Sequence, residues 1–136
     1  MDKIKIISEL ERECFPDSFW DEGAVTAQLS QKTTFSNVIF SENEPVGFYL
    51  GSSVAGEAEL YRIAVRPSLR RRGLASELMK ELISSRKGNS DEMIFLEVRS
   101  KNIPAIALYE KFGFERIGVR TGYYKDDDAL IYKLSL

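Results

Sequence analysis

The stretch ELYRIAVRPSLRRRGLASELMKEL, residues 59–82, passes from an extended pattern to a helical one through three consecutive arginines and a glycine. The part up to Val65 has the composition of a strand, and Pro67 is expected to end it. Beyond Gly73 the apolar residues return at the spacing of an amphipathic helix, in the pattern of Leu74, Leu78, Leu82 and Ile83. The stretch therefore predicts a strand, a short basic turn and a helix in direct succession.

Arg70, Arg71 and Arg72 stand directly before the predicted helix and admit three readings: a solvated charge run, a nucleic-acid surface, or a cradle for a phosphorylated ligand. Helix N-termini bind anions because their first N–H groups are unpaired and carry partial positive charge. Arginines add charge-assisted contacts to phosphate, and Gly73 has no Cβ to hold a phosphate away from the backbone. The formal net charge of −2 argues against a nucleic-acid surface. The triplet by itself leaves the other two readings open.

The chain has 136 residues, which is the length of one domain with a single core. It contains no apolar run of the ~18 residues that a membrane span needs, and no signal-peptide block at its start. Its single cysteine excludes an intramolecular disulfide, so we expect a cytoplasmic protein. The chain has no histidine, which excludes His-based catalytic triads and histidine zinc sites.

The periodicities along the chain predict an α+β domain. The order of elements is two helices, three strands, a helix, a strand, a helix and two strands, which gives a largely antiparallel sheet with helices on its faces. Asp2 and Asn102 are expected to cap helices. The predicted helices cover residues 2–14, 21–31, 73–88 and 102–112, and the predicted strands cover 33–40, 45–54, 57–65, 93–98, 119–124 and 129–136.

The segment 59–82 resembles the acetyl-CoA-binding segment of the GCN5-related N-acetyltransferases, the GNAT superfamily. In that family a strand and a turn precede Arg/Gln-x-x-Gly-x-Gly/Ala at the start of a helix, and Arg70, Gly73 and Ala75 occupy these positions. The resemblance implies that the pyrophosphate of coenzyme A rests on the loop amides, so acetyl-CoA is the expected cosubstrate. The residues implied to bind it are Ile63, Ala64, Val65, Arg70, Arg71, Arg72, Gly73, Leu74, Ala75, Ser76 and Asn102.

A second segment, FLEVRSKNIPAIALYEKFGFERIGVRTGYY at 95–124, is similar to the RimI-type enzymes, the ribosomal-protein alanine N-acetyltransferases. The resemblance covers residues 9–136 and implies that 1–136 is a single GNAT domain. Its fold would be a central, mostly antiparallel mixed sheet flanked by helices, with the family's first strand apparently missing. The spacing of FPDSFW at 15–20 and the short loop after Tyr124 also depart from the family. In relatives, the FPDSFW region and the loop after Tyr124 both contact the acceptor side.

The resemblance implies roles for three further groups. Glu97 matches the general base, although in most proteins a glutamate in an apolar strand simply faces outward. Tyr109 matches the general acid, although an amphipathic core residue would look the same. A phenol of pKa about 10 would protonate a thiolate near 8.5 with about 2 kcal/mol against it. The N–H of Val65, at a strand bulge, would stabilise the oxyanion.

Two other features favour structural roles. Cys14 lies on the apolar stripe of the first predicted helix, so we expect a buried, inert thiol rather than an acetyl carrier. The sequence KDDD at 125–128 lacks the alternation and glycine of a calcium loop, so we expect a solvated turn and no metal.

The expected activity is transfer of an acetyl group from acetyl-CoA to the α-amine of a protein N-terminus, of the ribosomal-protein alanine type, by direct attack. A free α-amine has a pKa of about 7.7–8.0, against about 10.4 for lysine, so it demands little of a carboxylate base. The alternatives are acetylation of a small-molecule amine, a non-catalytic acyl-CoA-binding module, and RNA or ribosome binding through the arginines. We expect a monomer or weak dimer that acts without a membrane or direct nucleic-acid contact.

Overall fold

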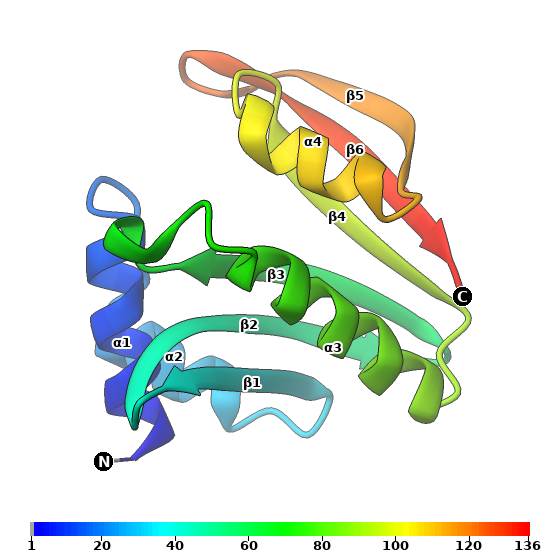
Figure 1. The fold of residues 1–136 in the computed structure, drawn as a ribbon. Helices are drawn as coiled ribbons and strands as arrows, with labels where there is room; N and C mark the ends of the chain where they lie inside the picture. Colours follow the sequence, from blue (N-terminus) through cyan, green and yellow to red (C-terminus); the bar gives the residue numbers. More distant parts are fainter. Residues whose placement is uncertain (1) are drawn as a thin grey trace.

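The structure is a computed structural model and describes residues 2–136. Its elements follow the order expected from the sequence (Figure 1). The helices are α1 (Lys3–Cys14), α2 (Glu22–Leu29), the short 3₁₀ helix η1 (Pro67–Leu69), α3 (Leu74–Gly88) and α4 (Ile103–Lys111). The strands are β1 (Thr34–Ser41), β2 (Glu44–Val54), β3 (Glu57–Val65), β4 (Met93–Arg99), β5 (Glu115–Tyr124) and β6 (Asp127–Ser135).

The six strands form one mixed sheet in the order β1-β2-β3-β4-β6-β5. All neighbours are antiparallel except β3 and β4, which are parallel and connected through α3. Their pairing runs only from Glu57↔Met93 to Leu60↔Leu96. Beyond that point the two strands diverge, as Figure 1 shows, so the second half of β3 has no partner on its β4 side.

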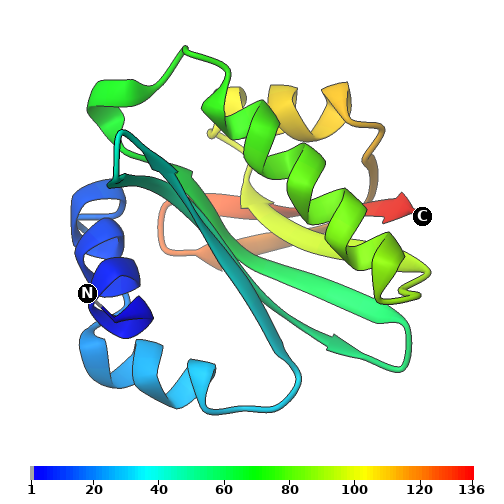
Figure 2. The ribbon, with the colours of Figure 1, turned by 60° about the horizontal axis from the view of Figure 1, so that its bottom comes forward.

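Helices cover both faces of the sheet (Figure 2). The larger core joins α3 and α4 to one face and includes Leu60, Leu78, Leu96 and Tyr109. The smaller core joins α1 and α2 to the other face, over β1 to β3. The face of β4, β6 and β5 on the α1 side therefore stays open.

Local signals explain where three of the helices begin. The side chains of Asp2, Asp21 and Asn102 each accept a hydrogen bond from the first turn of the helix that follows. The predicted caps at Asp2 and Asn102 are thus confirmed. The helix predicted over 21–31 is shorter, because the chain turns after Leu29.

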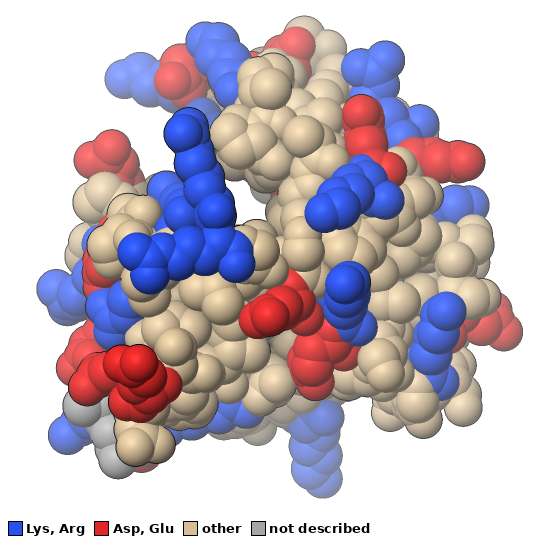
Figure 3. All heavy atoms as spheres, viewed as in Figure 1, with Lys and Arg blue, Asp and Glu red and all other residues tan. Residues whose placement is uncertain are grey.

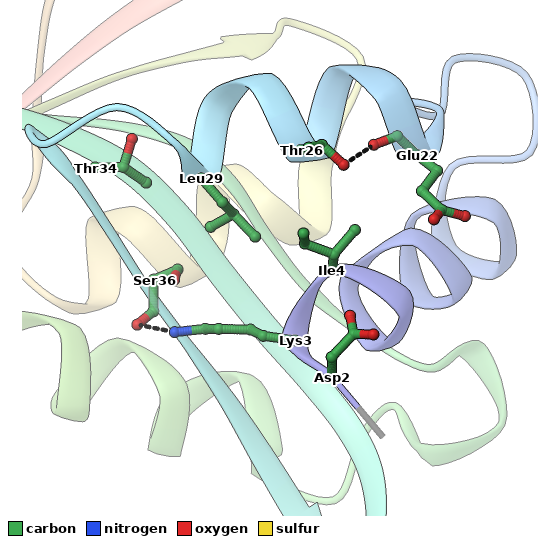
Figure 4. Close-up of a pocket in the computed structure, with 8 residues that line it drawn as sticks. All are labelled: Asp2, Lys3, Ile4, Glu22, Thr26, Leu29, Thr34 and Ser36. Atoms are coloured by element: carbon green, nitrogen blue, oxygen red, sulfur yellow. Dashed lines mark hydrogen bonds between the residues drawn. The ribbon is translucent and has the colours of Figure 1, made fainter.

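One edge strand of the sheet is β1 and the other is β5, and α1 is the first element of residues 2–136. A hollow of about 530 Å³ lies between α1, α2 and β1 (Figure 4). Lys3 reaches across it, and its Nζ donates a hydrogen bond of 3.2 Å to the carbonyl of Ser36. Lys3 thus covers part of the exposed edge with a charge. Across residues 2–136, every helix is too short or too polar to cross a membrane.

Candidate active site

A pocket of about 760 Å³ opens where β3 and β4 diverge. It is bounded by the segment between α1 and α2, the end of β3, β4, α4 and the end of β5. The lining residues are Phe15, Ser18, Trp20, Glu59, Leu60, Tyr61, Arg62, Ile63, Glu97, Val98, Arg99, Asn102, Ala105, Tyr109, Arg120, Tyr123 and Tyr124. Both expected catalytic residues are therefore in one pocket, together with Ile63 and Asn102 from the expected cosubstrate set.

A bulge in β3 sets which side chains reach this pocket. Leu50 pairs with Arg62 and Gly51 with Leu60, so Tyr61 is an extra residue without a partner on β2. The alternation of side chains shifts at such a point. The sequence interpretation placed a bulge close to Val65, whereas the structure places it at Tyr61, four residues earlier.

The bulge turns Tyr61 and Arg62 to the same face. The Tyr61 ring lies 6.1 Å from that of Trp20, and Arg62 forms an ion pair with Glu11 of α1. After the bulge, Ile63 and Val65 pack into the core beneath α3 instead. The side chains of Tyr61 and Arg62 therefore both face the pocket, although consecutive residues of a regular strand point to opposite faces.

The backbone after the bulge offers free donors on the divergent edge. The N–H of Arg66 donates to the carbonyl of Val46 on β2. In an antiparallel pair every second residue points its N–H and C=O to the partner strand, so Ala64 also points these groups to β2. Ile63 and Val65 turn theirs away from β2, toward the space that β4 has left. Ala64 lies between these two residues, and its side chain packs against the smaller core.

Glu97 projects from β4 to the face opposite the large core. Its neighbours Leu96 and Val98 are buried under the helices, whereas the Glu97 side chain keeps 25% of its area exposed. Its Oε1 lies 2.9 Å from Nε of Arg120 on β5. The carboxylate is therefore held by a partner, and one side of it remains open to the pocket.

Tyr109 approaches the same pocket from α4, on the other face of the sheet. The ring is 7% exposed and packs against Phe114 and Tyr132, at centroid distances of 5.7 and 6.5 Å. Burial, with a smaller effect from Tyr124, raises the pKa of Tyr109 to about 12. Tyr109 borders the pocket, and its raised pKa keeps the phenol protonated near neutral pH.

The start of α3 is the one α-helix N-terminus in residues 2–136 without a side-chain cap. Gly73 adopts φ +79°, and no atom lies within 4 Å of where its Cβ would be. The first intrahelical bond is Glu77 N to Gly73 O, so the N–H groups of residues 74–76 are unpaired. The anion cradle expected here from the sequence stays a prediction.

The three arginines of the loop differ. Arg70 Nε donates to the carbonyl of Val65, at 3.1 Å, which fastens the loop to the end of β3. Arg71 and Arg72 are exposed, and Arg71 has φ +65°. Figure 3 shows Lys and Arg side chains gathered at the loop before α3, beside a notch in the surface. Lys111 of α4 brings a further cation to the start of α3, since its Nζ lies 3.2 Å from Ser76 Oγ. No sequence signal pointed to this residue, because it is far from α3 along the chain.

The aspartates at 126–128 are engaged in protein contacts. The hydroxyl of Ser100 and backbone N–H groups lower the pKa of Asp127. Asp126 pairs with Arg99, Asp127 accepts from the Ser100 hydroxyl and the Lys101 N–H, and Asp128 accepts from the Gly122 N–H. The three carboxylates therefore attach the β5–β6 hairpin to the β4–α4 loop and to β5. Arg99 also stacks on Tyr124, 4.0 Å from its ring centre.

Cys14 is half-buried, and its Sγ lies 3.6 Å from the carbonyl of Val65. Burial is the main cause that raises the pKa of this thiol. Its position at the end of α1 agrees with the structural role expected from the sequence.

Comparison with known proteins gives a consistent result. Residues 4–114 match the family described as the Acetyltransferase (GNAT) family. The ribosomal protein bS18-alanine N-acetyltransferase of Escherichia coli K12 is 33% identical, over 98% of this chain and 99% of its own. The N-alpha-acetyltransferase RimI of Mycobacterium tuberculosis is 32% identical, over 93% and 82%. The crystal structure of the E. coli ribosomal-protein-S18-alanine N-acetyltransferase superposes with a TM-score of 0.91 at 28% identity, covering 99% and 90% of the two chains.

Proposed function

The chain belongs to the acetyltransferase (GNAT) family and is an acetyl-CoA-dependent N-acetyltransferase, and we propose that its acceptor is the N-terminal α-amine of a protein. One observation carries the proposal: Glu97 and Tyr109 enter a single pocket from opposite faces of the sheet. Acyl transfer from a thioester to an amine needs a base on the side of the amine and a proton donor on the side of the leaving sulfur. The divergence of β3 and β4 supplies the opening between them.

In this proposal the diphosphate of acetyl-CoA binds the unpaired N–H groups of residues 74–76, over Gly73. Arg71, Arg72 and Lys111 add positive charge around it. The pantetheine arm follows the free edge of β3 at Ile63 and Val65 in the manner of an added strand. Asn102 already caps α4, and it borders the same pocket.

The reaction then proceeds by direct attack. The neutral amine nitrogen forms a bond to the thioester carbon, and the N–H of Val65 stabilises the resulting oxyanion. Collapse of the intermediate breaks the carbon–sulfur bond and releases coenzyme A as a thiolate. Glu97 accepts the proton that the amine loses, directly or through one water.

Tyr109 serves the leaving thiolate. With a pKa of about 12, complete proton transfer to a thiolate near 8.5 is unfavourable by about 5 kcal/mol, which exceeds the 2 kcal/mol expected for an ordinary phenol. A hydrogen bond from the hydroxyl to the developing thiolate carries no such cost. Tyr109 therefore acts first as a hydrogen-bond donor, and the thiol takes its final proton from tyrosine or solvent.

The pKa of the amine favours an N-terminal acceptor over a lysine side chain. Near pH 7.5 roughly a third of free α-amines are neutral, against about one lysine in a thousand. Glu59 and Glu97 border the pocket, but Arg62, Arg99 and Arg120 border it too, so the charge of the lining does not by itself select a cationic terminus. The similarity to bS18-alanine N-acetyltransferases supports a ribosomal protein that begins with alanine as the acceptor.

Tandem mass spectrometry tests the proposal. The protein is incubated with acetyl-CoA and a peptide that begins with Ala or Ser and contains an internal lysine; the same peptide with a blocked α-amine is the control. We expect acetylation of the α-amine, with the ε-amine modified much more slowly. Preferential ε-acetylation, or no peptide product beside rapid acetylation of a polyamine, would contradict the N-terminal assignment and favour a small-molecule acceptor.

A further inference from the structure

A buried ion pair lies beneath the acceptor side of the pocket and has no part in the reaction described above. Glu11 of α1 is fully buried, and its Oε2 lies 3.2 Å from Nε of Arg62, whose side chain is 18% exposed. Burial is the main cause that raises the pKa of Glu11. A buried carboxylate needs a fixed partner, and Arg62 is that partner.

The same guanidinium holds the segment that connects α1 to α2. Its Nη2 donates a hydrogen bond of 2.6 Å to the carbonyl of Ser18. Its Cζ lies 4.2 Å from the ring centre of Phe15 and 5.7 Å from that of Trp20. Glu11 completes the attachment, because its Oε1 accepts a hydrogen bond of 2.8 Å from the N–H of Trp20. Arg62 thus connects β3 to both ends of the segment 15–20.

This segment forms one wall of the pocket. Phe15, Ser18 and Trp20 all line it, and Trp20 also packs against Tyr61 of β3. Arg62 borders the pocket too, but Ser18 and Glu11 already engage its Nη2 and Nε atoms. The bulge at Tyr61 makes the contact possible, because it turns Arg62 to the α1 face.

We propose that Arg62 is a positioning residue for the acceptor: it fixes the aromatic wall formed by Phe15 and Trp20, against which the first residues of the substrate bind. The identity of the acceptor rests on the proposed function, whereas the fixing of the wall does not. Arg62 lies on the α1 face, away from the unpaired amides of α3, so loss of the contact affects the acceptor and not acetyl-CoA.

The substitution Arg62→Lys tests this inference. Lysine keeps a positive charge beside Glu11 but cannot form the planar, forked contacts with Ser18 and the rings. Arg66→Lys is a matched control, since Arg66 directly follows the same strand, pairs with Glu13 of α1 and donates to the carbonyl of Pro45, outside the pocket. The double variant Glu11→Gln/Arg62→Met removes both charges together, which protects the test against misfolding from an unpaired buried charge.

Two readouts are measured. The chain has a single tryptophan, Trp20, so acrylamide quenching of its fluorescence reports the wall directly and without any substrate. We expect at least a twofold larger quenching constant in Arg62→Lys and in the double variant, and no change in Arg66→Lys. In steady-state assays we expect the KM for the peptide to rise about tenfold, while the KM for acetyl-CoA stays within twofold of wild type.

The two readouts separate the possible failures. Quenching that is equal in Arg62→Lys and Arg66→Lys, in folded proteins, overturns the positioning role whatever the activity. A parallel rise in the KM of both substrates overturns it as well, because it indicates general loosening of the fold. Absence of acetylation of any peptide, with quenching as expected, contradicts the proposed acceptor and leaves the positioning of the wall supported.

Discussion

Replacement of Gly73 tests the acetyl-CoA cradle most directly, because the structure separates its effects on folding and on binding. The residue has φ +79°, and a Cβ there would meet no atom within 4 Å. Gly73→Ala therefore strains only the backbone, by about 1–2 kcal/mol, with a fall in Tm of about 3–8 °C. In the proposed function, the new methyl group would stand in the space through which a diphosphate reaches the helix amides.

The expected loss of affinity follows from those amides. One charge-assisted hydrogen bond contributes about 1.5–3 kcal/mol, so loss of a single contact weakens acetyl-CoA binding by about 10- to 150-fold. Gly73→Glu adds a carboxylate to the proposed diphosphate site; two like charges about 4 Å apart near a protein surface repel by about 4 kcal/mol, which predicts a loss of about 1000-fold. Isothermal titration calorimetry measures both, and thermal melts followed by circular dichroism measure the stability.

Two other glycines provide matched controls. Gly56 in the β2–β3 turn has φ +83°, and a methyl group added there would make only ordinary contacts, so Gly56→Ala reproduces the strain away from the cradle. Gly88, the last residue of α3, has open space around it, so Gly88→Glu adds the same charge to the other end of the same helix. Equal acetyl-CoA affinities in Gly73→Ala and Gly56→Ala would refute the cradle.

Three further predictions concern the chemistry and its charges. Tyr109→Phe should lower kcat far more than it changes the KM for acetyl-CoA. Because a raised pKa of about 12 keeps the phenol protonated, wild-type kcat/KM should rise with pH to a plateau and should not fall again below pH 10. A fall below pH 10 in pH–rate data would count against Tyr109 as the donor. Glu97→Gln should lower kcat/KM, with a deficit that narrows between pH 7 and 9 as the α-amine deprotonates unaided; a constant deficit in the same assay would remove Glu97 from the proton path. Arg71→Gln/Arg72→Gln should weaken acetyl-CoA binding several-fold at low salt and little at 0.5 M salt, and a salt-independent loss in titration calorimetry would indicate a packing role.

Several parts of the site could be predicted because they depend on neighbours in the sequence. The cap at Asn102 needs only the first turn of its own helix, and the helix start at Gly73 needs only a strand, a turn and a helix in succession. The alternation around Glu97 likewise placed its side chain on the face opposite Leu96 and Val98. The shift at Tyr61 left one sequence signal, two adjacent large polar-ended residues in an otherwise alternating strand, and that signal was not recognised.

Other contacts involve residues that are distant along the chain. Arg62 meets Glu11, Arg120 meets Glu97, and Lys111 reaches Ser76, and none of these pairs shares a helix or a strand. Side chains of these types are equally compatible with solvent, so composition and periodicity give no reason to pair them. The elevated pKa of Tyr109 has the same origin, because burial beneath the packed sheet and not the residue type raises it.

The sequence by itself determined the order of helices and strands, because hydrophobic periodicity and capping act over a few consecutive residues. Its motifs identified the family by resemblance, and the glycine motif predicted an anion-binding start of α3. Only the tertiary structure decided that β3 and β4 part after Leu60, and that the bulge at Tyr61 brings Arg62 to the wall of the resulting pocket. Strand pairing and register are settled between segments that are far apart in the chain, where the packing of helices on both faces selects one arrangement. The chemistry of the pocket depends on that arrangement, since it alone brings Glu97 and Tyr109 to one opening from opposite sides of the sheet.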